Sequence, residues 1–199
     1  MRYPNAIKKN VNKTITNHKN RGMSLEEALN KTNIYYLENG LAVIYKKPTP
    51  IKVLETKYKE GNKQLITKAV YEKKSTTDYN GVYKGKYLDF EAKETENKKY
   101  FSFTNIKKHQ IAHIKKVMKQ KGISFVIIGF SKLDRTFLLE SKIIIEMMDK
   151  NKKNISIHEL EEKGYEIKES YNPRLNYLKI IDNLYFEEEL WKKIKKLKK

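Results

Sequence analysis

The sequence predicts a single domain of alternating helices and strands, of the α/β or α+β layer class. Two observations lead to this prediction. Helix signals and strand signals alternate along the chain without any internal repeat, and residues 125–130 form a continuous apolar run typical of a buried strand. Of the 199 residues, 39% are hydrophobic, which is enough for one core. We therefore expect one globular domain over residues 24–186.

The two ends of the chain differ in composition from this domain. Residues 1–23 contain basic side chains, no acidic ones and few large apolar ones, which is typical of a flexible basic arm. Residues 187–199 form a lysine-rich tail. If it is helical, its last ten residues are basic and amphipathic, which suits a DNA backbone or a membrane surface, and a frayed solubilising tail is the alternative.

The first half of the domain is expected to contain a helix and three strands. Ser24 and Glu27 form a capping box, and Gly40 ends the helix that follows. Residues 42–45 are expected to form a strand, which residues 46–50 break. The β-prone runs 51–54 and 65–71 flank a turn-like segment at 59–62, which is a hairpin pattern. The residues expected to be buried in the first helix are Leu25, Ala28, Leu29 and Tyr36.

The second half alternates between the two element types. We expect a helix over residues 105–120 closed by Gly122, strands at 125–130 and 137–139, and a short helix or strand at 143–148. A capping box at Ser156 starts a helix that ends at Gly164. Asn172-Pro173 is expected to start the last helix, with inward residues Leu175, Leu178, Ile181 and Leu184.

One set of charged residues has a spacing that suggests a catalytic site. Asp78 is followed by twelve intervening residues and then by Glu91, Ala92 and Lys93. In an extended strand alternate side chains share a face, so Asp89, Glu91 and Lys93 point one way, onto an open surface. Turn residues at 80–81 and 84–85 allow the chain to reverse, which would bring Asp78 back beside Glu91.

Two neighbouring carboxylates repel each other, and a hard divalent cation such as Mg²⁺ removes that repulsion. Lys93 would then donate to a scissile phosphate or to the attacking hydroxide. The spacing is therefore typical of a metal-dependent phosphodiesterase. From spacing alone a second interpretation stays open, in which these are charged residues on the wet face of an antiparallel sheet.

Composition limits the partners. The formal net charge of +19 favours a polyanion such as DNA. The absence of cysteine excludes disulfides and thiolate-bound zinc. His109 and His113 have the spacing of a zinc-binding helix, but Gln110 replaces the required glutamate, so we expect them to contact solvent or phosphate. Neither a signal peptide nor a membrane span is expected, which favours the cytoplasm.

Four segments occur in the order found in one known family: residues 21–23, 46–50, 75–81 and 89–95. Residues 109–111, 125–128 and 173–186 extend the match. Together they closely resemble the bacterial RecU-type Holliday-junction resolvases over nearly the whole chain. The resemblance implies a restriction-endonuclease-like α/β fold, with a central mixed sheet flanked by helices and a hairpin over residues 51–75 that projects as a stalk.

The resemblance also implies the activity: a homodimer that nicks four-way junction DNA symmetrically and with Mg²⁺, during homologous recombination and DNA repair. It leaves open whether one or two ions act at each site and whether Mn²⁺ substitutes. It suggests a recombinase and a branch-migration helicase as protein partners, and no membrane partner. The family's metal-site residues fall on Thr76, Asp78, Glu91 and Gln110, and its transition-state stabiliser falls on Lys93.

Further residues are expected to contact DNA phosphates, and Glu26 or Glu27 is a candidate additional acid near the metal. Two alternative functions remain: a duplex-specific restriction or repair endonuclease of the same fold, and a non-catalytic architectural protein that uses its charge and fourteen tyrosines to bind DNA. The expected phosphate contacts are Arg21, Lys57, Lys59, Lys63 and Lys68.

Overall fold

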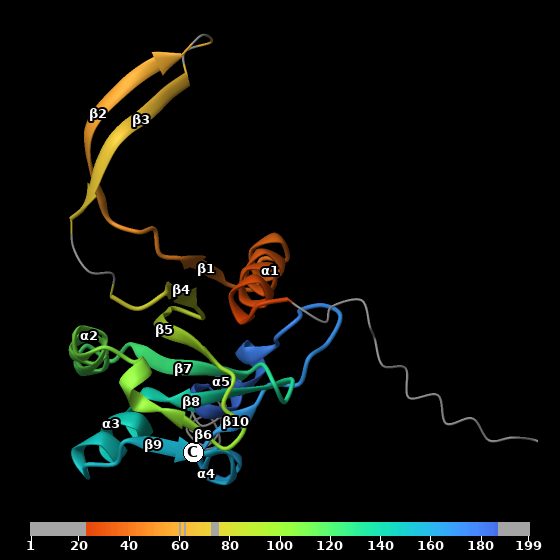
Figure 1. Cartoon of the computed structure of the whole chain (residues 1–199). Helices are drawn as coiled ribbons and strands as arrows, with labels where there is room; N and C mark the ends of the chain where they lie inside the picture. The colour runs from red at the N-terminus through yellow and green to blue at the C-terminus, as the bar shows by residue number, and fades with distance from the viewer. Residues whose placement is uncertain (1–22, 60, 62, 73–75, 187–199) are drawn as a thin grey trace, which may run out of the picture.

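The computed structural model describes residues 23–59, 61, 63–72 and 76–186 (Figure 1). The predicted basic arm, except Met23, and the predicted tail lie outside the described residues. Within them, no helix is both long and apolar enough to cross a bilayer.

A six-stranded mixed sheet forms the centre of the molecule, in the order β1-β4-β5-β7-β8-β10. β5 and β7 run parallel, and the other neighbours are antiparallel. This arrangement confirms the predicted central mixed sheet. The strands are β1 (Val43–Lys46), β4 (Tyr79–Tyr83), β5 (Lys86–Thr95), β7 (Ile123–Phe130), β8 (Arg135–Glu140) and β10 (Tyr165–Glu166).

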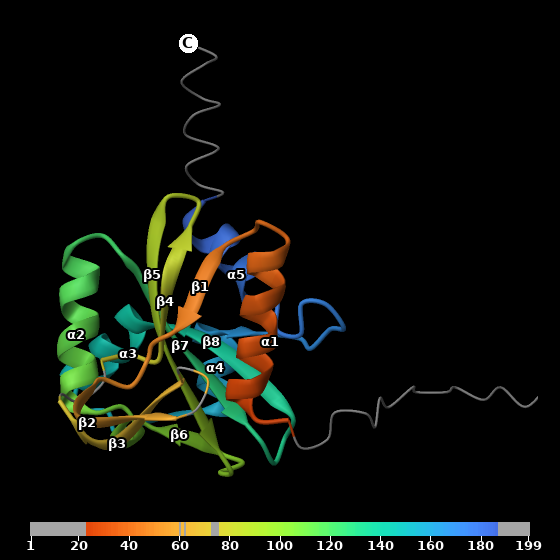
Figure 2. The ribbon, with the colours of Figure 1, turned by 90° about the horizontal axis from the view of Figure 1, so that it is seen from above.

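Helices cover both faces of this sheet (Figure 2). α1 (Leu25–Glu38) and α5 (Tyr177–Tyr185) pack on one face, around Phe90 of β5 and Phe125 of β7. Those two rings stack with their centroids 4.6 Å apart. The other face, with Val126 and Ile128 of β7, is covered by α3 (Ser141–Asp149) and α4 (Ile157–Lys163). α2 (Lys108–Lys119) contacts β5 and β7.

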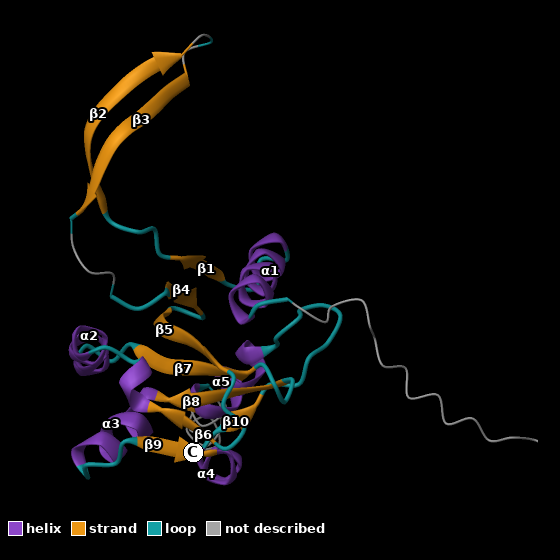
Figure 3. Ribbon diagram, in the orientation of Figure 1, coloured by secondary structure: helices purple, strands orange, loops and turns teal. Residues whose placement is uncertain are grey.

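A separate two-stranded hairpin, β2 (Ile51–Lys59) and β3 (Lys63–Tyr71), extends away from the body (Figures 1 and 3). The hairpin is exposed to solvent on both faces, since all residues of 51–58 and 63–71 are exposed. The Glu72 amide donates to the Pro50 carbonyl (3.1 Å) at its base. The projecting stalk is therefore confirmed over its described residues; residues 60, 62 and 73–75 lie outside them.

The turn before the candidate acid motif differs from the prediction. Lys84 and Gly85 form the β4–β5 turn, both with positive φ (47° and 75°), as expected. Asn80 and Gly81, which were also expected to turn, instead lie inside β4. A Cβ on Gly81 would lie 2.1 Å from the Val43 carbonyl oxygen, so this glycine permits β1 to pair closely with β4.

Most remaining elements are confirmed, with shifted ends. α2 begins at Lys108 rather than 105, after a short 3-10 turn at Phe103–Asn105, and Lys121 (φ 64°) makes the left-handed turn that was expected of Gly122. α5 begins at Tyr177 rather than at Pro173. The ambiguous segment 143–148 lies in helix α3. The sequence interpretation missed three short strands: β6 (Tyr100–Ser102) and β9 (Asn154–Ser156), which pair with each other, and β10, which pairs with β8.

Candidate active site

Three charged side chains lie on one face of β5, as the alternation predicted, but they are not on an open surface. Asp89 and Glu91 are fully buried, and the Lys93 side chain is 25% exposed. The cause is α2, which packs over this part of the sheet. Because β5 also pairs in parallel with β7, these residues are not on the wet face of an antiparallel sheet.

The hydrogen-bonding capacity of the Glu91 carboxylate is only partly used. Its Oε1 accepts a 2.6 Å hydrogen bond from Gln110 Nε2 and pairs with the Lys93 ammonium. Its Oε2 is buried and has no hydrogen-bond partner among the described residues. Burying a carboxylate oxygen without a hydrogen-bond partner costs free energy of folding. An unpaired oxygen of this kind therefore indicates a position where a ligand binds.

Asp78 returns beside Glu91, as the sequence predicted. Its Oδ2 accepts a hydrogen bond from the Ala92 amide (3.2 Å), directly after Glu91 in β5. Burial raises the pKa of Glu91 to about 7; the Lys93 ammonium opposes this rise and the Asp78 carboxylate adds to it. The two acids therefore repel each other in the protein alone.

Gln110 is fixed at the start of α2. Its Oε1 accepts from the Lys107 amide (2.8 Å), so the side chain caps its own helix while its Nε2 holds Glu91. Thr76 precedes Asp78 by two residues. Among the described contacts its hydroxyl is held by Lys47 Nζ (3.1 Å) rather than by either carboxylate. The structure thus gathers Asp78, Glu91, Lys93 and Gln110, with Thr76 on the same loop as Asp78.

These residues fit a divalent cation. The described residues hold no cluster of three or more histidine or acidic side chains suited to a metal ion. Two carboxylates with oxygen donors nearby are instead what Mg²⁺ requires, since it keeps several waters and takes further oxygens from a phosphate. The orphan Oε2 of Glu91 supplies the free ligand atom.

The raised pKa of Glu91 predicts a pH effect on the metal-free protein. Glu91 titrates near 4.5 when unfolded and near 7 when folded, so between these values only the folded state keeps the proton. Raising the pH from 4.5 through 7 should lower the free energy of unfolding, by about 3 kcal/mol at most for this group. Urea unfolding in EDTA between pH 5 and 8.5 measures this. The wild type should lose stability relative to Glu91→Gln as the pH rises, and parallel curves would contradict the shift.

A second buried acid, Asp89, was placed on this face by the sequence interpretation but was given no role in the site. Its Oδ2 accepts from Lys47 Nζ (2.6 Å), Tyr87 Oη (3.0 Å) and His113 Nε2 (3.1 Å), and Oδ1 accepts from the Thr77 hydroxyl. Burial alone would raise the pKa of Asp89, but the hydrogen bonds from Lys47, Thr77 and His113 hold it below its ordinary value. Its position two residues before Glu91 was the available signal.

The structure adjusts the predictions for the two histidines and for the two candidate additional acids on the first helix. His109 is exposed, as expected, whereas His113 contacts Asp89 rather than solvent or phosphate alone. The carboxylate of Glu26 pairs with Lys46 (2.5 Å) and that of Glu27 with Lys31 (2.9 Å). Each of these candidate additional acids therefore already has a cationic partner.

The predicted DNA contacts lie mainly on the stalk. Lys57, Lys63 and Lys68 are exposed, and Lys68 lies 3.6 Å from Glu55. Arg21 and the side chain of Lys59 lie outside the described residues.

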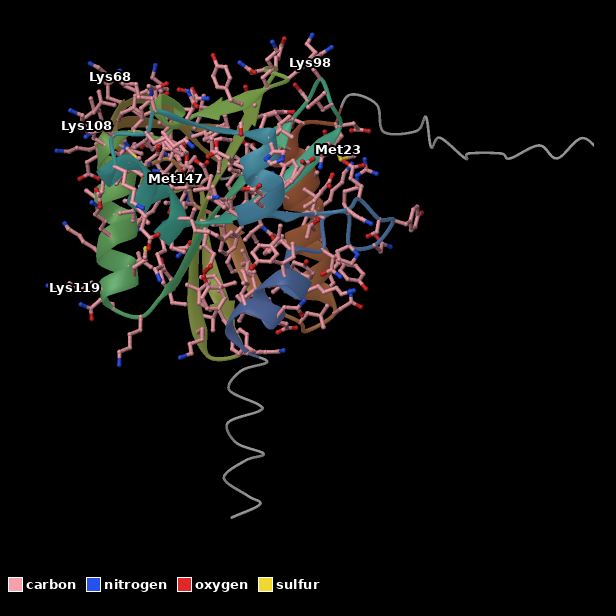
Figure 4. The ribbon with its side chains drawn as sticks, turned by 90° about the horizontal axis from the view of Figure 1, so that it is seen from below. Met23, Lys68, Lys98, Lys108, Lys119 and Met147 are labelled. Carbon is pink, nitrogen blue, oxygen red and sulfur yellow. The ribbon has the colours of Figure 1, made fainter. Side chains whose placement is uncertain are left out.

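A surface hollow of about 680 Å³ lies between the β4–β5 turn and α2, beside two of the residues that donate to Asp89. Tyr87 and His113 line it, together with Lys86, Lys116 and Lys121. Figure 4 shows Lys108 and Lys119 on the outside of α2, at its two ends. The surface beside the candidate site is therefore basic.

Comparisons with known proteins identify the family of this chain. The family model described as Recombination protein U matches residues 20–183. Relatives named Holliday junction resolvase RecU include one from Geobacillus kaustophilus, 44% identical over 92% of this chain and 92% of its own length. Another, from Bacillus cereus, is 45% identical over 94% of this chain and 98% of its own length.

Among solved structures, a Holliday junction resolvase named Hjc from Archaeoglobus fulgidus aligns with a TM-score of 0.34 and 10% identity, over 62% of this chain and 80% of the other. That likeness is too weak to support an argument. The family model and the relatives instead cover the domain that holds Asp78, Glu91 and Lys93, and on that evidence this chain belongs to the RecU family of recombination proteins.

Proposed function

We propose that this chain is a divalent-metal-dependent endonuclease that resolves four-way DNA junctions by symmetric nicking, in homologous recombination and DNA repair. The observation that carries the proposal is the buried Glu91 Oε2, orphaned beside Asp78 and Lys93 in a chain whose relatives are named Holliday junction resolvases. Mg²⁺ is the proposed ion, and Mn²⁺ the proposed substitute.

Asp78 and Glu91 would hold the cation, with Thr76 and Gln110 assisting directly or through waters. When bound, such an ion activates water and offsets the charge that develops on the phosphate. Gln110 keeps the Glu91 carboxylate oriented through Oε1, which leaves Oε2 free. Lys93, held by Glu91, would place its ammonium near the scissile phosphate and stabilise the transition state.

Junction selectivity cannot come from this site alone, because every duplex carries the same phosphodiester. The stalk is suited to recognising the shape of a junction, since it extends from the body, is exposed along both strands and carries Lys57, Lys63 and Lys68. We propose that it enters the junction and that these lysines bind its phosphates.

A homodimer would provide two active sites for two symmetric cuts. The edge of the central sheet is a candidate surface for a second copy. Val43 and Tyr45 on β1 and Val82 on β4 share one face and are 48%, 54% and 51% exposed. β1 is also an edge strand, which leaves backbone groups available for pairing.

Cleavage of an end-labelled mobile four-way junction and of its constituent duplex tests the proposal. The wild type should make paired, symmetrical nicks in the junction with Mg²⁺ and none with EDTA. Asp78→Ala should lose cleavage by at least about a hundredfold because it removes a metal ligand, while still binding the junction through many phosphate contacts.

Asp149→Ala is the matched control, since Asp149 is an exposed acid on α3 paired only loosely with Lys115 (3.5 Å). It should cleave like the wild type. Equal cutting of junction and duplex would favour the duplex-specific endonuclease of the same fold. Binding without cutting in either Mg²⁺ or Mn²⁺ would leave the architectural DNA-binding protein as the function.

A further inference from the structure

The chain leaves the body for the stalk and returns from it at nearly the same place. Lys47 directly follows β1 on the outgoing side, and Thr76 and Thr77 lie on the returning side. The Lys47 amide donates to the Asp78 carbonyl (2.8 Å), and Lys47 Nζ donates to the hydroxyls of Thr76 (3.1 Å) and Thr77 (2.6 Å). The two ends of the stalk are therefore bound to each other.

Both ends are also bound to Asp89. Lys47 donates to its Oδ2 and Thr77 to its Oδ1, while Tyr87 and His113 donate further to Oδ2. Asp89 is fully buried, and its oxygens are occupied by these donors. It is therefore poorly suited to bind a cation itself, unlike Glu91, whose Oε2 has no described partner.

Asp89 also lies next to the proposed metal site. It precedes Glu91 by two residues on the same face of β5, a separation of about 7 Å along a strand. The loop that it holds through Thr77 carries Asp78 at the next position, and Asp78 in turn binds the Ala92 amide of β5. One carboxylate thus joins the stalk base, the Asp78 loop and the catalytic strand.

We propose that Asp89 is a positioning residue that couples the stalk to the metal site: by holding Lys47 and Thr77, it keeps the loop with Thr76 and Asp78 in register with Glu91 when a junction engages the stalk. This inference rests on the proposed function. It predicts that the Asp78 loop becomes more ordered when DNA binds at the stalk, and that Asp89 is needed for this response. Asp89 itself touches neither substrate nor ion.

Asp89→Asn tests the coupling, because it keeps the shape but weakens the bonds from Lys47 and Thr77. Single-turnover junction cleavage should fall about 10–100-fold, the usual range for residues that orient metal ligands. The Mg²⁺ concentration for half-maximal cleavage should rise about tenfold. Junction affinity measured with Ca²⁺ should change less than about threefold, since phosphate contacts elsewhere dominate it.

Hydrogen exchange provides a readout that a merely structural role would not move. The Lys47 amide, bonded to the Asp78 carbonyl, should exchange more slowly in the wild type once junction DNA is added with Ca²⁺. In Asp89→Asn this slowing should disappear. Lys47→Met should behave like Asp89→Asn, and the double variant should lose no more activity than either single one, because they break the same link.

Asp182→Asn is the matched control. Asp182 accepts from Tyr83 Oη (2.9 Å) and from Lys84 Nζ (2.5 Å), so it holds a similar set of donors at the β4–β5 turn, away from the stalk base. It should lower thermal stability without changing the Mg²⁺ dependence or the exchange response. The proposed coupling would be contradicted if Asp89→Asn matched Asp182→Asn in every measurement. It would also be contradicted if the effects of Lys47→Met and Asp89→Asn on the cleavage rate were additive in the double variant. A wild type that cleaves no junction would instead contradict the proposed function.

Discussion

Replacing Glu91 by glutamine should abolish junction cleavage while the protein stays folded and still binds the junction. Glutamine has the shape of glutamate and can keep the bond from Gln110. It removes the negative charge and the free carboxylate oxygen that would bind the cation. Replacing a residue that only orients metal ligands lowers activity about 10–100-fold. Replacing a ligand itself should therefore lower the single-turnover rate at saturating protein by more than about a hundredfold.

Glu94→Gln is the control for this variant. Glu94 lies on the same strand but on the opposite face, where its side chain is exposed. It should cleave at the wild-type rate. Urea unfolding establishes that Glu91→Gln is folded, and above pH 7 without metal it should be the more stable protein. Retention of wild-type cleavage by Glu91→Gln would exclude Glu91 as a metal ligand.

Lys93→Met should lower the rate of cleavage about 10²–10³-fold, as expected when one preorganised donor to a developing negative charge is lost. Methionine keeps most of the length of the side chain and removes only the ammonium group. The carboxylates of Asp78 and Glu91 remain, so the Mg²⁺ concentration for half-maximal cleavage should stay close to that of the wild type. Single-turnover rates across a Mg²⁺ titration separate these two effects.

Lys132→Met provides the comparison. Lys132 pairs with Glu96 (3.3 Å) on the surface, as Lys93 pairs with Glu91 in the site. Its loss should change neither rate nor Mg²⁺ dependence. If Lys93→Met instead shifted the Mg²⁺ midpoint and left the saturated rate unchanged, Lys93 would serve to arrange the ligands rather than to stabilise the transition state.

The elements that local signals determine were largely predictable. Ser24 and Ser156 cap the starts of α1 and α4, with the full capping box formed at Ser156, and the continuous apolar run at 125–130 lies in the buried strand β7. The Asn80-Gly81 pair shows the limit. Its turn signal is strong, but Gly81 serves the close approach of β1, from a segment almost forty residues earlier in the chain. No local pattern contains that information.

The candidate site shows the same division. Alternation along β5 correctly placed Asp89, Glu91 and Lys93 on one face, but it could not show that α2 buries this face. The hydrogen-bond donors to Asp89 come from positions as distant as Lys47 and His113. The full set of hydrogen bonds to this carboxylate therefore depends on the tertiary fold. The roles assigned to Thr76 and Gln110 came from the family resemblance, and they stay predictions.

Binding of Mn²⁺ to the metal-free protein, followed by electron paramagnetic resonance, is the sharpest test of the metal site because it needs neither DNA nor turnover. We expect the wild type, Lys93→Met and Asp149→Ala to bind Mn²⁺ with similar affinity. Asp78→Ala and Glu91→Gln should each weaken binding by at least about tenfold. Equal Mn²⁺ affinity in all five proteins would show that Asp78 and Glu91 do not form the metal site.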